Sequence, residues 1–297
     1  MTSILLEIKI GLDPTIVSIA GLDITWHGLF TALGVIVGVA ISSFLARRMN
    51  YPEDMIYNVA LALVIGGIVG ARGLYVIEHW HLFKDDLGEI FAINTGGISI
   101  YGALIGATIA GWGYAMITRV PNIPRGADIA AIGGIMGMAI GRIGDIINGE
   151  HFAKASDLPW AVVYTDTNSP AYGFGAQHPA VAYELIGDMF IFAILFYVYY
   201  KIPRAGVTFC VWVLLYGIMR FFVSFLRLDT EVLLGLRMAQ VIAVVTIPPA
   251  LITLVYLLRT PPAAERAARA RRRREERDEV PSPPPPPPPV SEEPSTG

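Results

Sequence analysis

The chain has 297 residues, of which 54% are hydrophobic and only 16% are charged, and its mean hydropathy is +0.55. This composition excludes an ordinary water-soluble domain and indicates an integral membrane protein. The formal net charge of -3 excludes nothing by itself, because the charges are segregated along the chain. The single cysteine, Cys210, cannot form an internal disulfide, and without a nearby Cys and His cluster we expect neither a metal site nor a cofactor.

Residues 1–24 contain Glu7 and Asp13 and lack the order of basic, apolar and small residues that defines a signal peptide. We therefore expect the first apolar segment to direct membrane insertion. A helix needs about 20 apolar residues to cross the hydrocarbon. Seven segments have this length or nearly so: residues 26–46, 55–77, 98–118, 127–147, 179–200, 205–226 and 238–258. The sequence predicts an all-α membrane protein with about seven transmembrane helices.

Basic residues in the short connections predict the orientation of these helices. They follow the first, third, fifth and seventh segments, whereas the other connections carry mainly acidic residues. Because cytoplasmic connections have an excess of Lys and Arg, we expect the N-terminus outside and the C-terminus in the cytoplasm. The basic residues concerned are Arg47, Arg48, Arg119, Arg125, Lys201, Arg204 and Arg259.

The composition changes abruptly from residue 261 onward. An arginine-rich run spans residues 266–277, prolines fill positions 283–289, and the end is rich in Ser and Glu. Such a segment lacks the apolar residues of a core, so we expect a membrane domain over residues 1–260 and a disordered cytoplasmic tail over 261–297. The arginines suit anionic lipid headgroups, and because no aromatic residues interleave them we expect no nucleic-acid partner.

Polar residues within the apolar segments collect at one depth. They come from six segments and lie in the half that the predicted orientation places in the outer leaflet. Ionisable residues inside a membrane are costly and are functional-site candidates by default. We therefore expect a cavity in the outer leaflet, lined by His27, Arg72, Tyr101, Arg142, Asp145, Tyr216, Arg220 and Gln240.

Three arginines in this set indicate an anionic ligand. Arg72, Arg142 and Arg220 keep their charge at ordinary pH, and a planar guanidinium matches a pair of phosphate oxygens. A phospholipid headgroup is the expected guest. Two structural alternatives stay open. Arg142 could pair only with Asp145, three residues later on one helix face, and Arg72 could extend to the end of its span and pair with Glu78.

The stretch of residues 141–151 is the densest part of this polar set. Asn148 and Glu150 follow Arg142 and Asp145 where the apolar segment ends, so donors, acceptors and flexible glycines occur together. This combination favours a polar pocket over a solitary ion pair. The following loop, residues 151–178, mixes aromatic and polar residues that are typical of a membrane interface, where it could cover the cavity or meet an outer protein partner. His178 is expected to cap or orient the next helix.

Glycines are predicted to have two uses. Gly96 and Gly97 permit a tightly turned entry to the helix that contains Tyr101 and Gly102. Other glycines are spaced for close packing of helices, and we expect no chemistry from them. These are Gly66, Gly67, Gly70, Gly133, Gly134 and Gly137.

The run from Gly141 to Glu150 resembles the signature of the prolipoprotein diacylglyceryl transferases of bacterial inner membranes. Further segments resemble that family in the same order, and the likeness covers roughly residues 20 to 258. They are Trp26-His27-Gly28, Gly96-Gly97 with Tyr101-Gly102, His178-Pro179 with Tyr183-Glu184, and Tyr216-Gly217 with Arg220-Phe221. Several separated motifs in one order are more specific than any single motif.

The resemblance implies a multi-pass inner-membrane enzyme that transfers the diacylglyceryl group of phosphatidylglycerol to the lipobox cysteine of a prolipoprotein signal peptide. The thiol would form a thioether and release glycerol phosphate, without a cofactor. Arg142 and Arg220 would bind the phosphate and stabilise its developing charge. The catalytic residues implied are Arg142, Arg220, His27, Tyr101 and Glu150. The residues expected to bind the lipid are Arg142, Arg220, Asp145, Asn148, Tyr216, Gly96, Gly102 and Arg72.

Four positions depart from the family pattern. Tyr101 replaces a histidine that is a candidate base, His27 replaces a tyrosine, Asp145 replaces an asparagine, and Ala153 replaces an expected glycine. Three interpretations stay open: His27 has exchanged roles with Tyr101, solvent ionises the thiol without a protein base, or the chain is a paralogue with altered chemistry. We expect the first, with the two side chains as a coupled pair.

The rival class is a non-enzymatic carrier or binding protein for an anionic lipid. Intramembrane arginines are compatible with it. A carrier should have polar residues that continue toward the cytoplasmic side, but the inner halves of the first, third, fifth and seventh segments are almost entirely apolar. A pocket closed at its inner end favours an enzyme that works in one leaflet.

Overall fold

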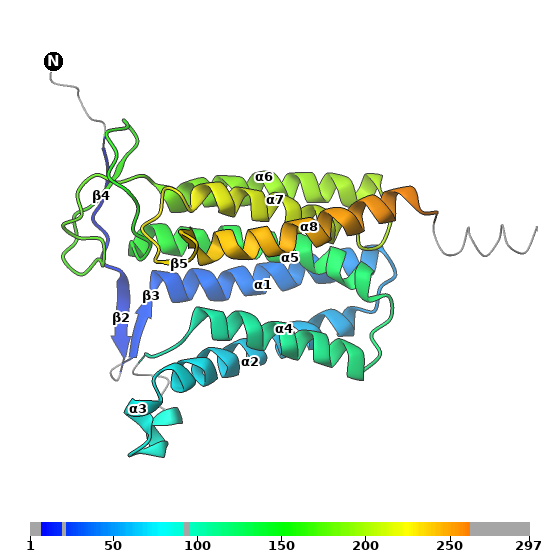
Figure 1. The fold of residues 1–297 in the computed structure, drawn as a ribbon, viewed down its shortest axis with the longest axis horizontal. Coiled ribbons are helices and arrows are strands. Elements are labelled where there is room, and N and C mark those ends of the chain that lie inside the picture. Colours follow the sequence, from blue (N-terminus) through cyan, green and yellow to red (C-terminus); the bar gives the residue numbers. More distant parts are fainter. Residues whose placement is uncertain (1–6, 20–21, 92–95, 262–297) are drawn as a thin grey trace, which may run out of the picture. The chain divides into compact units, whose positions relative to one another are not determined.

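The computed structural model describes residues 7–19, 22–91 and 96–261. Figure 1 shows that helices dominate it. The α-helices are α1 (Trp26–Arg48), α2 (Glu53–Glu78), α3 (Trp80–Phe83), α4 (Ile100–Ile117), α5 (Ile123–Asn148), α6 (Ala180–Lys201), α7 (Val207–Val223) and α8 (Met238–Arg259), with a 3-10 helix η1 (Leu87–Phe91). The strands are β1 (Ile8–Ile10), β2 (Thr15–Ile19), β3 (Leu22–Thr25), β4 (Val162–Tyr164), β5 (Glu231–Leu233) and β6 (Leu236–Arg237).

Six helices within the described residues are long and apolar enough to cross a membrane: α1, α2, α4, α5, α6 and α8. The seventh expected span corresponds to α7, which is apolar but has only 17 residues. The prediction of a helical membrane protein is confirmed. The largest difference in position is at α5, which begins at Ile123 rather than at residue 127, because Asn122 caps it and accepts a hydrogen bond from the Arg125 amide.

Glycines bring two pairs of helices into close contact. Gly34 and Gly38 of α1 face Gly137 and Gly133 of α5, and a Cβ on Gly34 would lie 2.4 Å from the Gly137 carbonyl oxygen. Contacts this short leave no room for a side chain, so each glycine sets the distance between its helices.

A second glycine interface joins α2 to α4. Gly66 and Gly70 of α2 face Gly106 and Gly102 of α4, and a Cβ on Gly66 would lie 2.6 Å from the Gly106 carbonyl oxygen. The predicted packing role of Gly66, Gly70, Gly133 and Gly137 is confirmed. For Gly134 it is wrong, because that position faces open space.

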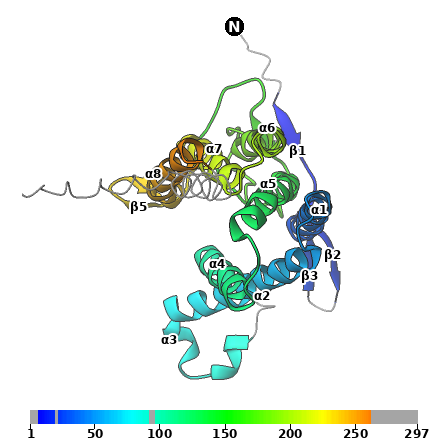
Figure 2. The ribbon, with the colours of Figure 1, turned by 90° about the vertical axis from the view of Figure 1, so that its right-hand side faces the viewer.

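Short strands lie at one end of the helices (Figure 1). β1 pairs in parallel with β4, which is far away in the sequence, and Ile8 is the partner of Val162. The hairpins β2–β3 and β5–β6 lead directly into α1 and α8. Figure 2, turned by 90°, shows the β2–β3 hairpin near α1 and the β5–β6 hairpin near α8.

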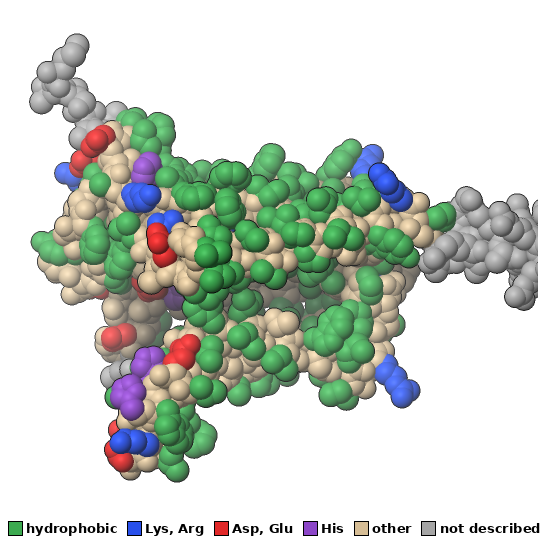
Figure 3. Space-filling view, in the orientation of Figure 1, with side chains coloured by type: hydrophobic (Ala, Val, Ile, Leu, Met, Phe, Trp, Pro, Cys, Tyr) green, Lys and Arg blue, Asp and Glu red, His purple; other side chains and the backbone are tan. Residues whose placement is uncertain are grey.

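The surface supports a membrane setting. Figure 3 shows apolar side chains along the sides of the helices, mixed charges and histidines at the strand end, and only basic side chains at the other end of this face. Arg47 and Arg48 end α1, and Lys201 ends α6. This distribution fits the predicted orientation, which stays a prediction.

The chain divides into two units, with the boundary between Leu257 and Leu258. Nearly all the described elements belong to the first unit. The predicted boundary at residue 260 is not tested, because residues 262–297, where the disordered tail was expected, lie outside the described residues.

We expect Gly106→Ala to destabilise the protein and Gly113→Ala in the same helix to leave it unchanged or stabilise it slightly. A Cβ on Gly106 would lie 2.2 Å from the Gly66 carbonyl oxygen, whereas Gly113 has nothing within 4 Å. Overpacking costs about 1–3 kcal/mol, and alanine gains roughly 0.5–1 kcal/mol over glycine in a helix. Thermal unfolding in detergent measures both. Equal melting temperatures for the two variants would contradict the packing of α2 on α4.

Candidate active site

A carboxylate without any exposed surface is the centre of the polar cluster. Glu184, in the first turns of α6, faces one arginine from α5, one from α7 and one from the segment after α7. Arg142 Nη2 lies 2.8 Å from Glu184 Oε2, Arg220 Nη1 pairs with Oε1, and Arg227 Nη1 donates to Oε1 at 3.4 Å. A buried charge is tolerated when it is paired, so the guanidinium groups compensate this carboxylate.

A second buried carboxylate lies one turn from the end of α5. Asp145, with 6% of its side chain exposed, faces three nitrogen donors. Oδ1 lies 2.6 Å from His27 Nδ1, and Oδ2 lies 3.0 Å from Arg142 Nη1 and 3.5 Å from His151 Nε2. Arg142 therefore joins Asp145 to Glu184. The alternative of a solitary Arg142–Asp145 pair is wrong, although the pair itself is present.

The end of α5 arranges the rest of the signature. Asn148 Oδ1 accepts the His27 backbone amide at 3.2 Å, and Asn148 Nδ2 donates to Glu150 Oε1 at 2.6 Å. Gly149 ends the helix with φ of 73°, and a Cβ there would lie 2.6 Å from Ser169 Oγ. Only glycine suits this conformation and this close contact. Asn148 and Glu150 are thus connected to the start of α1.

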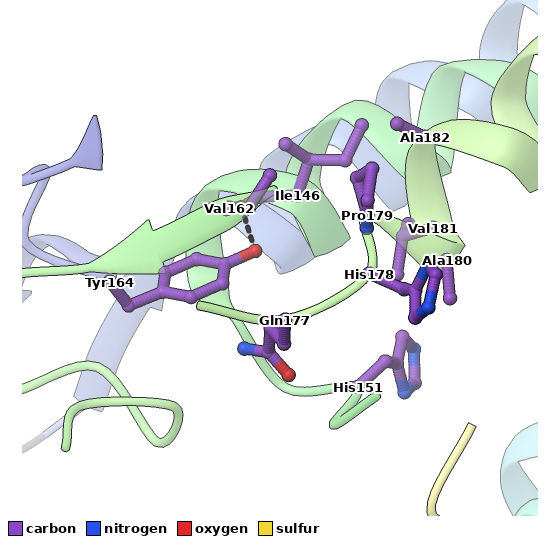
Figure 4. A pocket seen from close by; sticks show the side chains of 10 residues that line it. All are labelled: Ile146, His151, Val162, Tyr164, Gln177, His178, Pro179, Ala180, Val181 and Ala182. Carbon is purple, nitrogen blue, oxygen red and sulfur yellow. Dashed lines mark hydrogen bonds between the residues drawn. The ribbon is translucent and has the colours of Figure 1, made fainter. Parts of the chain in front are cut away.

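The loop of residues 151–178 folds over the end of α5. Tyr164 donates its hydroxyl to the Ile146 carbonyl at 2.8 Å, and a pocket of about 30 Å³ lies beside it (Figure 4). His151, Gln177 and His178 line this pocket, which is too small for a lipid headgroup. The expected capping by His178 is not observed: the cap residue of α6 is Pro179, and within the described residues His178 Nδ1 is buried without a hydrogen-bond partner.

The Arg72 guanidinium donates hydrogen bonds to backbone carbonyl groups. Nε donates to Ile90, Nη2 to Glu89, and Nη1 to Gly96 and Gly97, at 2.6 to 2.9 Å. These four bonds tie the end of α2 to the connection that precedes α4, and they replace the alternative pairing with Glu78. Gly96 and Gly97 have φ of 85° and 73°, as a tight turn requires.

Other predicted site residues lie apart or at the edge of the cluster. Gly102 packs against the Gly70 carbonyl oxygen. Tyr101 is 40% exposed, and in the described part of the chain neither a hydrogen bond nor a ring contact joins it to His27. The expected pair is absent because α1 packs on α5 whereas α4 packs on α2. Tyr216 stacks on Trp212 and is close enough to interact electrostatically with the arginines.

Sequence reasoning missed several partners of the arginines. Glu184 was noted only as part of a motif, although a carboxylate in the apolar α6 is itself a signal. Asp188, one turn later, is fully buried, and both of its oxygens are without hydrogen-bond partners among the described residues. Arg227 also bonds Asp229, at 2.9 Å, and His151 Nδ1, at 3.1 Å. Arg227 and Asp229 follow α7, so they lie outside the apolar segments that hydropathy selects.

Tyr164→Phe should lower stability at pH 8 and reduce the loss of stability at alkaline pH. Burial raises the pKa of the Tyr164 phenol to about 12 from its usual value of about 10. The neutral phenol is favoured in the folded state, so its contribution is complete below pH 10 and is lost as the pH rises toward 12. Without the bond to Ile146 we expect a loss of about 1 kcal/mol at pH 8.

Thermal unfolding in detergent at pH 8 and pH 11 measures this effect. The control is Tyr172→Phe, because Tyr172 is 51% exposed in the same loop. We expect the Tyr164 variant to lose less stability between the two pH values than the wild type and the control. Identical losses in all three proteins would contradict the burial of this phenol.

Comparison with known proteins identifies the family of this chain. The family described as prolipoprotein diacylglyceryl transferase matches residues 14–256. Three relatives bear the name phosphatidylglycerol–prolipoprotein diacylglyceryl transferase. The one from Clostridioides difficile is 34% identical over 83% of this chain and 96% of its own, that from Nostoc is 36% identical over 82% and 89%, and that from Finegoldia magna is 35% identical over 80% and 92%. The chain belongs to the prolipoprotein diacylglyceryl transferase family.

Proposed function

We propose that this multi-pass membrane protein transfers the diacylglyceryl group of phosphatidylglycerol to the lipobox cysteine in the signal peptide of a prolipoprotein, at the bacterial inner membrane. The sulfur attacks the glyceryl carbon next to the phosphate. A C–S bond forms and the C–O bond to the phosphate breaks, so glycerol phosphate leaves and the thiol proton passes to a base. Family membership and the apolar helices support this assignment.

The observation that carries the proposal is an unsatisfied donor. Arg142 Nη1 and Nη2 face Asp145 and Glu184, but its Nε is buried and, among the described residues, without a hydrogen-bond partner. An orphaned buried donor costs about 1–3 kcal/mol, more for a charged group. A phosphate oxygen is an acceptor that would satisfy it, and Arg220, paired with the same Glu184, supplies a second cation.

The same arginines suit the chemistry of the leaving group. As the C–O bond breaks, a second negative charge develops on the departing phosphate. Fixed cations in a water-poor site stabilise such a charge without reorganisation. Glu184 and Asp145 determine where the guanidinium groups point, and we infer that Asn148, Glu150 and Tyr216 orient the headgroup hydroxyls or the arginines.

An apolar groove lies between α7 and α8 and is lined by residues that flank Arg220 in the sequence. Phe221 and Phe222 in α7, with Ile218, face Ile247 and Pro248 of α8 across a space of about 340 Å³. Such a surface suits an acyl chain whose headgroup is bound by the arginines. The lipid-binding role predicted for Arg72, Gly96 and Gly102 stays a prediction, and their contacts favour a structural role for each.

Arg220→Lys should retain the charge and lose the planar, bidentate geometry. We expect transfer to fall by about 10- to 1,000-fold, as for loss of one electrostatic contact to a transition state. Purified protein is incubated with phosphatidylglycerol and a lipobox peptide, and mass spectrometry follows the diacylglyceryl addition to the cysteine.

Arg48→Lys is the matched control, because Arg48 lies in the last turn of α1 over the Phe44 ring. It should transfer at the wild-type rate. Full activity in both Arg220→Lys and Arg220→Gln, at normal levels of folded protein, would sink the assignment of Arg220. Binding of the lipid without any transfer by the wild-type protein would favour a carrier.

A further inference from the structure

We propose that His27 accepts the proton of the attacking thiol and that Asp145 positions it, so that one carboxylate connects the base to the arginines. This inference rests on the proposed transferase function. It deepens that function by assigning the proton, which the arginines cannot take because they remain charged.

The end of α5 fixes His27 at two points. Its backbone amide donates to Asn148 Oδ1 at 3.2 Å, and its Nδ1 lies 2.6 Å from Asp145 Oδ1. Gly144 permits this approach, because a Cβ there would lie 2.7 Å from the Trp26 carbonyl oxygen and 2.8 Å from His27 Cα. The imidazole is therefore held at the start of α1 against the signature helix.

The Asp145 bond assigns the tautomer of the His27 ring. A carboxylate accepts a hydrogen bond, so the proton lies on Nδ1 and the lone pair on Nε2. In the described part of the chain Nε2 makes neither a hydrogen bond nor an ion pair, and 43% of the side chain is exposed. Nε2 is thus free to accept a proton from a group that approaches from outside.

Asp145 also stabilises the imidazolium that would form. Its other oxygen pairs with Arg142 and His151, and Glu150 Oε2 lies 4.0 Å from His27 Nδ1 as a second negative group. A carboxylate in this place orients an imidazole and compensates its positive charge while remaining ionised itself. The proposed base, His27, and the proposed phosphate-binding residue, Arg142, therefore contact the same carboxylate.

The neighbouring histidine does not offer a free nitrogen. His151 Nδ1 accepts from Arg227 Nη2 at 3.1 Å, which leaves its proton on Nε2, 3.5 Å from Asp145. Tyr101, the other candidate from the sequence, is a phenol, which donates a hydrogen bond readily but is a poor proton acceptor beside an imidazole. His27 is the better placed base of the three.

The step balances with the groups present. The S–H proton moves to His27 Nε2 as sulfur forms the C–S bond, and the electrons of the breaking C–O bond remain on the phosphate oxygen. Glycerol phosphate leaves with one more negative charge than the lipid carried. The imidazolium then returns its proton to solvent, and the neutral ring is restored.

The experiment compares two acceptor peptides, one with the lipobox cysteine and one with selenocysteine in its place. A selenol is ionised at neutral pH, so it needs no base. For each variant the ratio of the selenocysteine rate to the cysteine rate is measured in one preparation, which makes it independent of the amount of folded protein. His27→Gln should raise this ratio by at least about 100-fold over the wild type.

Asp145→Asn should raise the ratio by less, because the amide still accepts the Nδ1 hydrogen bond but lacks the charge. Arg220→Lys should slow both peptides and leave the ratio unchanged. His79→Gln is the matched control and should behave as the wild type, since the His79 ring stacks on Tyr75 away from the cluster.

An unchanged ratio in His27→Gln, whether both rates are normal or both are low, overturns His27 as the base. An unchanged ratio in Asp145→Asn overturns its positioning role. Failure of the wild-type protein to modify either peptide rejects the proposed function itself, and so is distinguishable from failure of this inference.

Discussion

The arrangement of α5, α6 and α7 depends on the burial of the Glu184 carboxylate among three guanidinium groups. In an apolar bundle this charge is tolerated only while Arg142, Arg220 and Arg227 face it. Loss of one partner from a buried pair typically costs about 3–5 kcal/mol. The contacts that fix these helices are therefore the contacts that orient the proposed phosphate site, and stability and function are coupled at this point.

Glycine packing supplies the complementary constraint on α1. Gly34 and Gly38 bring α1 against α5 along most of its length, and Gly144 lets the start of α1 reach the end of α5. His27 meets Asp145 for this reason. Glycines hold α2 and α4 together in the same way. Arg72 consequently donates to backbone carbonyl groups in the connection between α2 and α4, and it does not lie beside the other arginines.

Hydropathy predicted the helices well because the thickness of a bilayer imposes their length, and it also identified Arg142, Arg220 and Asp145 as unusual. Depth along a helix can be read from the sequence, but lateral neighbours cannot. The glycines that were expected to pack helices lie on the second and fourth spans, and the sequence did not reveal that α1 packs on α5 and that α4 packs on α2. The expected His27–Tyr101 pair was wrong for this reason, and the His27–Asp145 contact was missed. Glu184 was underestimated because the sequence places it on its helix but does not show which arginines it faces.

The central claim is that Arg142 and Arg220 bind the phosphate of the lipid. Solid-state NMR can measure dipolar contacts between phosphorus and nitrogen-15-labelled guanidinium groups, with one equivalent of phosphatidylglycerol in a phosphate-free detergent. Individual arginines are assigned from the signals that single Arg→Lys variants remove. The account predicts contacts from Arg142 and Arg220 to the same phosphorus. A bound lipid whose phosphorus contacts neither of them, or contacts Arg72 instead, would contradict it.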